Sequence, residues 1–222
     1  FLEENVFKGY KNGIFVDVGA YDGLLINNTH YFEKYNQWTG INIEPMKKAF
    51  NSLLLNRPNC ININCAVTNK DGVESFYNNT GFTTLTSGLK NTYNEHHYKR
   101  LQDDTKKYPE WHDDDNKEIV VKTSTKIIDV ETKKLETIFK EKNVKHINYL
   151  SIDVEGAEFE VIKSINFDEV FIDVIMFENN YEYLSQPIIK YLNDKQYKEI
   201  KHSTDIYMIH INSKFLNNLI SN

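Results

Sequence analysis

Residues 14–23 read Ile-Phe-Val-Asp-Val-Gly-Ala-Tyr-Asp-Gly, and this stretch decides the fold. Its first half, residues 14–18, is apolar and rich in β-branched side chains, which is typical of a buried strand. Its second half, residues 19–23, begins and ends with glycine and includes an aspartate, which is the composition of a tight turn. The stretch therefore predicts a strand that ends in a glycine-containing loop.

Apolar runs alternate with helix-like segments after this strand. The sequence predicts a helix over residues 30–36, a strand over 38–43, a helix over 46–56 and a strand over 61–67. This order, with short links, favours a parallel sheet covered by helices on both faces.

The rest of the chain continues in the same manner. Further strands are expected over residues 73–77, 119–123, 147–153, 174–177, 197–202 and 206–211, and further helices over 131–141, 157–164 and 187–192. The last two strands are close enough in sequence to form an antiparallel hairpin. The predicted fold class is α/β, with a mostly parallel seven-stranded sheet and an antiparallel hairpin at its C-terminal end.

The segment from residue 78 to about residue 117 lacks this periodicity. It contains Pro109 and an acidic triplet at residues 113–115. A stretch of this length without regular structure is uncommon in a compact domain unless it is functional or disordered. We interpret it as a variable insertion on the substrate side, with one short helix; a surface loop is the alternative.

Composition limits the domain count and the classes of partner. A chain of 222 residues with 40% hydrophobic residues is expected to form a single domain over residues 1–222. A net charge of −6 argues against nucleic acid as a partner. No apolar run approaches the roughly 20 residues of a membrane helix, and no secretory leader is recognisable. We expect a soluble protein without a membrane partner.

Two further features concern the cell compartment and the length of the chain. Cys60 and Cys65 are five residues apart in a predicted strand, so their side chains should lie on opposite faces and remain free thiols. Free thiols fit a reducing, cytoplasmic location. The abrupt start at Phe1 is compatible with a fragment of a longer chain that has a fusion partner domain.

Acidic or amide side chains close the central strands. They are Asp17, Glu44, Asp153 with Glu155, and Glu178 with Asn179. Ligands of open α/β sheets bind at the carboxyl ends of the strands. Carboxylates in such places cost stability unless a partner compensates them. We therefore expect one binding edge that takes a cationic or polyhydroxylated ligand.

Several segments, taken together, resemble the FkbM family of methyltransferases. They are FVDVGAYDG at residues 15–23, NT at 28–29, FE at 32–33, WTGINIEP at 38–45, SGL at 87–89 and YLSIDVEGAE at 149–158. Asn42 is a departure, because a small or apolar residue is more usual there. The resemblance implies a class I, Rossmann-like O-methyltransferase that uses S-adenosylmethionine (SAM). It also implies an acceptor hydroxyl on a sugar, a nucleotide-sugar or a similar polar small molecule.

Residues near the first loop have properties that a SAM site requires. Gly19 and Gly23 would allow close approach of the backbone, and Asp17 would hold the methionine ammonium group. The helix N-terminus at residues 28–29 would receive the methionine carboxylate, and Glu44 would accept both ribose hydroxyls. The predicted cofactor-binding residues are Asp17, Gly19, Tyr21, Asp22, Gly23, Asn28, Thr29, Glu44, Pro45 and Ala66.

Transfer to a hydroxyl requires help with its proton, and a metal ion is one source of that help. Asp153, Glu178 and Asn179 offer only oxygen ligands, which suit Mg²⁺. Asp153 is also a candidate catalytic residue without a metal.

A general base is the competing source. Glu155 and Glu158 follow the strand over residues 147–153, and His96 or His97 would reach the site from the insertion. Two rival functions remain open, an NAD-dependent oxidoreductase and a SAM-binding module without turnover. The incomplete glycine pattern and the acid-rich strand ends count against NAD.

Overall fold

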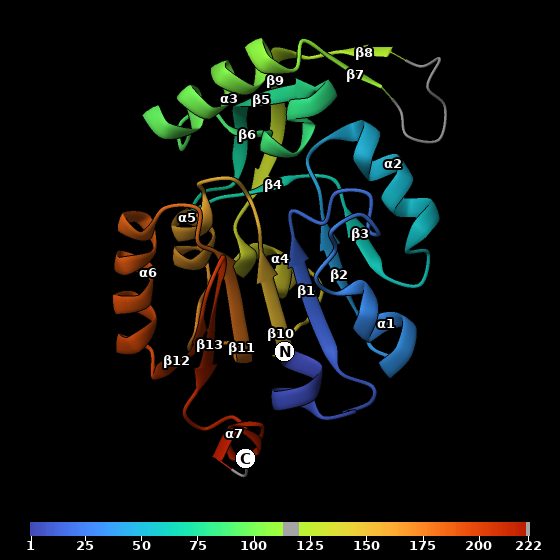
Figure 1. The fold of residues 1–222 in the computed structure, drawn as a ribbon. Helices are drawn as coiled ribbons and strands as arrows, with labels where there is room; N and C mark the ends of the chain where they lie inside the picture. Colours follow the sequence, from blue (N-terminus) through green and yellow to red (C-terminus); the bar gives the residue numbers. More distant parts are fainter. Residues whose placement is uncertain (113–119, 221–222) are drawn as a thin grey trace.

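The computed structural model describes residues 1–112 and 120–220 (Figure 1). Its main sheet has the strand order β12-β13-β11-β10-β1-β2-β3. Five adjacent strands are parallel: β11 (Phe171–Glu178), β10 (His146–Ile152), β1 (Ile14–Val18), β2 (Thr39–Ile43) and β3 (Ile61–Ile63). β13 (Asp205–His210) is antiparallel to β11 and to β12 (Tyr197–His202), so the sheet is mixed. The predicted α/β fold class is confirmed.

Side chains alternate along β1 and bury both faces of this sheet. Val16 and Val18 pack toward one group of helices, and Phe15 packs toward the other within an aromatic cluster. The first group is α4 (Leu135–Glu141), α5 (Glu158–Lys163) and α6 (Glu182–Asp194), and the second is the π-helix η1 (Leu2–Phe7), α1 (His30–Asn36) and α7 (Leu216–Ile220). None of the helices in the described part of the chain is long and apolar enough to cross a bilayer.

Asn42 occupies the middle of β2 and is fully buried. Its side-chain amide donates a hydrogen bond to Asn62 Oδ1 at 2.9 Å, and the two residues are register partners on β2 and β3. The polar pair across neighbouring strands satisfies the amide nitrogen of Asn42, while its Oδ1 has no hydrogen-bond partner among the described residues. The predicted strand is present despite its central polar residue.

The strand predicted over residues 61–67 is divided between two sheets. β3 ends at Ile63 and belongs to the main sheet, whereas β4 (Ala66–Val67) pairs with β9 (Ser124–Lys133) in a second sheet. Between them, the Asn64 side chain donates to the carbonyl oxygens of Glu44 and Pro45. These hydrogen bonds fix the turn at which the chain leaves the main sheet.

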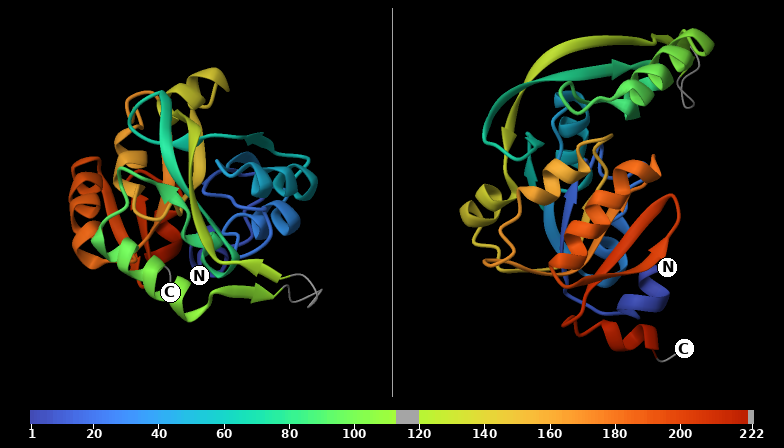
Figure 2. Two further views of the ribbon diagram at one scale, coloured as in Figure 1. Left: turned by 90° about the horizontal axis from the view of Figure 1, so that it is seen from above. Right: turned by 90° about the vertical axis from the view of Figure 1, so that its left-hand side faces the viewer.

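The second sheet has the order β4-β9-β5-β6 and is built on a long antiparallel ribbon of β5 (Gly72–Thr80) and β9. The ribbon extends from the main sheet and carries the green part of the chain over the upper end of the parallel strands (Figure 2). That part contains η2 (Gly81–Thr86), β6 (Gly88–Leu89), α3 (Glu95–Lys107), β7 (Glu110–His112) and β8 (Val120–Lys122).

Three sequence predictions need correction here. The described part of the insertion has regular structure, because it contains the 13-residue helix α3 rather than one short helix. The helix predicted over residues 131–141 begins only at Leu135, since the preceding residues pair with β5. The helix predicted over residues 187–192 extends over Glu182–Asp194. The acidic triplet at residues 113–115 lies outside the described residues.

Candidate functional site

A cavity of about 270 Å³ lies at the carboxyl ends of β1, β2, β10 and β11, and residues of the insertion also line it. This is near the lower end of the range for small-molecule sites. The predicted site residues that line it are Asp17, Gly19, Tyr21, Asn28, Glu44, Pro45, Ala66, Asp153, Glu155 and Glu178. The acids expected at one edge of the sheet therefore share one cavity.

Three predicted cofactor residues lie just outside this lining. Asp22 accepts hydrogen bonds from the backbone N–H groups of Leu24 and Leu25, so it shapes the loop. Gly23 has a φ of +82°, and a Cβ there would lie 2.6 Å from Arg57 Cγ. Thr29 is fully buried beneath the loop. These residues support the loop rather than face the cavity.

Three predicted catalytic or metal residues also lie outside it. Glu158 accepts a hydrogen bond from the Gly156 N–H, at the start of α5. His96 is on α3, with its ring 5.1 Å from that of Tyr181. Asn179 directs its side chain toward His202 and the Ser203 carbonyl.

Gly19 explains why the first loop can reach the centre of the site. It has a φ of +88°, and a Cβ at this position would lie 1.8 Å from the Asp153 carbonyl oxygen. Any side chain would therefore separate the ends of β1 and β10. The close approach brings Asp17 and Asp153 into the lining of the same cavity.

A buried polar network holds the loop between β1 and α1. Asp17 Oδ2 accepts hydrogen bonds from the Thr29 hydroxyl at 2.8 Å and from the Asn27 amide at 2.9 Å. Asn27 Oδ1 in turn accepts from the backbone N–H groups of Thr29 and His30, at the start of α1. Burial raises the pKa of Asp17, although these hydrogen bonds oppose the shift.

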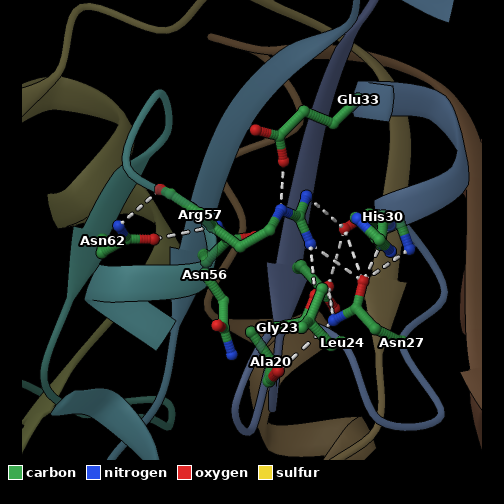
Figure 3. A network of polar contacts seen from close by, with 12 residues as sticks. Ala20, Gly23, Leu24, Asn27, His30, Glu33, Asn56, Arg57 and Asn62 are labelled. Atoms are coloured by element: carbon green, nitrogen blue, oxygen red, sulfur yellow. Dashed lines mark hydrogen bonds and ion pairs between the residues drawn. The ribbon is translucent and has the colours of Figure 1, made fainter. Parts of the chain in front are cut away.

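Arg57 lies at the centre of this network, and it was not among the predicted site residues. Its side chain is fully buried and forms an ion pair with Glu33 (Figure 3). Its terminal nitrogens donate to the Gly23 carbonyl at 3.1 Å, to Asn27 Oδ1 at 3.0 Å and to Thr29 Oγ1 at 3.2 Å. One guanidinium thus joins the end of α2 (Lys47–Asn56) to the first loop.

Glu44 is 3% exposed, and each of its oxygens accepts one backbone N–H group. Oε2 accepts from Tyr21 at 2.9 Å, and Oε1 accepts from Met46 at 2.7 Å. Burial raises the pKa of Glu44 to about 7, against the opposing effect of these hydrogen bonds. Carboxylate oxygens have further lone pairs, so Glu44 retains the capacity to accept from a ligand.

Asp153 and Glu178 form a hydrogen-bonded carboxyl pair at the ends of β10 and β11. Burial raises the pKa of both groups, and the charge of each neighbouring acid adds to the effect. The pair therefore retains a proton over the neutral range.

Asn179 does not join it, so the predicted magnesium ligand set is not assembled. Within residues 1–112 and 120–220, no group of three or more His, Cys, Asp or Glu side chains is arranged to hold a metal ion.

Glu155 is the carboxyl that the insertion contacts. It has a φ of +53°, and its Oε2 lies 3.5 Å from Arg100 Nη1 and 3.5 Å from Asn180 Nδ2. His97 Nε2 lies 3.9 Å from the same oxygen. Burial raises the pKa of Glu155 to about 7, while the charge of Arg100 acts in the opposite direction.

Arg100 was not among the predicted site residues, although it lines the cavity. The insertion showed no periodicity that would place one side chain of α3 over the strands. Only the long-range pairing of β5 with β9 brings this helix to the site. The motif at residues 87–89 was the one signal, because Ser87 and Leu89 also line the cavity.

Comparison with known proteins agrees with this geometry. A family model described as "Methyltransferase FkbM domain" matches residues 17–199. The chain belongs to the FkbM methyltransferase family. No curated protein sequence matches the chain.

A solved structure shares the fold. It is the methyltransferase FkbM from Methylobacillus flagellatus KT, with a TM-score of 0.51 and 9% sequence identity. The superposition covers 90% of this chain and 44% of the other, so the present chain spans less than half the length of that protein. At this identity the likeness concerns the fold alone.

Proposed function

We propose that this FkbM protein transfers a methyl group from SAM to a hydroxyl oxygen of a sugar, a nucleotide-sugar or a related polar small molecule. The observation that supports this proposal best is the arrangement of five carboxyl groups around one cavity at the carboxyl ends of the parallel strands. They are Asp17, Glu44, Asp153, Glu155 and Glu178.

The residues near the first loop fit the donor. Asp17 offers a buried carboxyl for the methionine ammonium group, and Glu44 offers its remaining lone pairs to the ribose hydroxyls. Pro45 and Ala66 line the cavity beside Glu44 and would border the adenine. When bound, the donor supplies an electrophilic methyl group on a sulfonium centre.

Glu155 is the candidate general base. It lines the cavity, and its pKa near 7 allows it to take a proton close to neutral pH. As the hydroxyl proton passes to Glu155 Oε2, the acceptor oxygen would bond to the methyl carbon, the bond between that carbon and sulfur would break, and S-adenosylhomocysteine would leave. The Asp153–Glu178 pair, which retains a proton, would donate a hydrogen bond to another acceptor oxygen and orient the sugar.

Calorimetric titration tests the proposed function directly. SAM and S-adenosylhomocysteine are each expected to bind with one-to-one stoichiometry, and NAD is expected not to bind. A screen of sugars and nucleotide-sugars then follows the mass increase of one methyl group. Binding of NAD without any response to SAM would support an oxidoreductase instead. Tight binding of both adenosyl ligands without transfer to any acceptor would support a binding module.

A further inference from the structure

Arg100 introduces a positive charge at an otherwise acidic cavity. Among the described residues that line this cavity, it is the only lysine, arginine or histidine. The lining also contains the five carboxyl groups named above. The ammonium and sulfonium groups of the donor fit the carboxyl groups, and its carboxylate is assigned to the loop at residues 28–29, where Asn28 lines the cavity, so Arg100 is left for the acceptor.

The guanidinium of Arg100 is only partly occupied by neighbouring residues. Its side chain is 42% exposed, and its closest ion-pair contact among the described residues is Nη1 to Glu155 Oε2 at 3.5 Å. The second contact, Nε to Asp104 Oδ2, is 3.9 Å and beyond hydrogen-bond range. A guanidinium has five N–H donors, so most of them remain available to a ligand. Half-exposed ion pairs of this kind contribute little to stability.

The position of Arg100 is fixed by the buried residue one turn before it on α3. His97 is 2% exposed, and its ring is 5.2 Å from the ring of Tyr93. The backbone of Gly156 abuts this ring, because a Cβ there would lie 2.7 Å from His97 Cε1. Residues three apart share one face of a helix, so this contact holds Arg100 next to Glu155.

The chemistry of arginine indicates what the free donors recognise. A planar guanidinium binds carboxylate and phosphate groups through paired hydrogen bonds. Binding of neutral hydroxyl groups does not require an arginine. In this cavity an anionic group of the acceptor would be repelled by every ionised carboxyl group, and the Arg100 guanidinium would offset that repulsion.

We propose that Arg100 forms an anion subsite and that the acceptor is a polyhydroxylated molecule with a carboxylate or phosphate group near the hydroxyl that is methylated. This inference rests on the proposed function and narrows its substrate class. In the proposed complex, Arg100 binds the anionic group while Glu155 faces the acceptor hydroxyl.

Ligand-observed NMR titrations of the full chain test the subsite without turnover. The probes are glucuronate, glucose 6-phosphate and neutral glucose, each with and without S-adenosylhomocysteine. The wild type is expected to bind at least one charged sugar about tenfold more tightly than glucose, or better. Arg100→Gln should reduce that affinity to the level of glucose, and Arg100→Lys should retain part of the preference.

The matched control is Lys99→Gln, which removes the same charge from the neighbouring exposed position on α3. It should leave the preference unchanged. The inference is overturned if the wild type does not distinguish charged sugars from glucose, or if Arg100→Gln retains the preference. If the charged sugars bind through Arg100 while SAM and S-adenosylhomocysteine do not bind, the proposed function fails and the anion subsite stands.

Discussion

Two properties suit Glu44 to binding a ligand in the cavity. It is buried, and both of its oxygens are already oriented by backbone N–H groups of Tyr21 and Met46. Orientation before binding lowers the entropic cost of contacting a ligand. The same hydrogen bonds connect the first loop to the start of α2, so Glu44 links cofactor binding to local structure.

Replacing Glu44 should therefore weaken ligand binding and also disturb the adjoining loop, because one backbone N–H group loses its acceptor. Glu44→Gln keeps the size of the side chain and one acceptor oxygen but loses the charge. We expect SAM affinity to fall by about tenfold or more, because hydrogen bonds to charged groups contribute about 1.5–3 kcal/mol. Calorimetry measures the affinity, with Glu199→Gln on β12 as a control at a distance from the cavity. Unchanged affinity would contradict the assigned contact.

Glu155 permits a second prediction for a single residue. If it is the general base, the maximal rate of methyl transfer should rise with pH through about 7, where Glu155 ionises. Glu155→Gln should reduce kcat by about 10²-fold or more and leave SAM affinity within a factor of about two. Steady-state kinetics over pH 5 to 9 checks both expectations. A variant with the wild-type pH profile would exclude Glu155 as the base.

At the scale of elements, the first loop is held in place by α2, a helix that follows it in the sequence. Arg57 directly follows the last residue of α2. Its side chain contacts Glu33 on α1 and the loop residues Gly23 and Asn27. A buried charge with this many partners cannot be removed without leaving other groups unpaired. The loop geometry at the cavity is thus a property of three elements together.

Arg57→Met should destabilise the protein by about 3–5 kcal/mol, because it leaves the buried polar groups around it without their partner. Urea unfolding, followed by circular dichroism, gives the free energy of unfolding. Lys48→Met provides the comparison, since Lys48 is exposed on the same helix. A loss below about 1 kcal/mol for Arg57→Met would show that the network contributes little.

Arg57 and Arg100 are residues whose roles could not be predicted from the sequence. Strands such as β1 and β11 are mostly apolar runs, and this pattern identified them and the acids near their ends. Arg57 and Arg100 interact with residues 24 or more positions away, and no local pattern encodes such contacts. Residues 124–130 of the ribbon strand β9 were assigned to no predicted element and residues 131–133 to a helix, because most side chains of this strand are exposed. Its pairing with β5 is a long-range feature.

At the scale of the whole molecule, the acids of the cavity make stability depend on pH. Burial raises the pKa of Glu44 and of Glu155 from 4.5 to about 7. A carboxyl with a raised folded-state pKa contributes its stability fully below the unfolded value, and that contribution is lost as pH rises through the folded value. For these two groups the loss falls between about pH 4.5 and pH 7. His97 acts in the opposite sense, because burial lowers its pKa.

The stability that a cationic ligand adds on binding should increase with pH, opposite to the trend of the free protein. We expect the melting temperature of the free protein to fall between pH 5 and pH 7.5 relative to Glu44→Gln, since the variant lacks one of the titrating groups. SAM should raise the melting temperature more at pH 7.5 than at pH 5, because ionised carboxyl groups then face a positive charge. Thermal unfolding with and without SAM measures both effects, and sinefungin, which has an amine in place of the sulfonium, provides a second cationic ligand.

If SAM stabilised the protein equally at both pH values, the carboxyl groups of the cavity would not be the groups that meet the donor. Their shared position at one edge of the sheet would then require a different ligand.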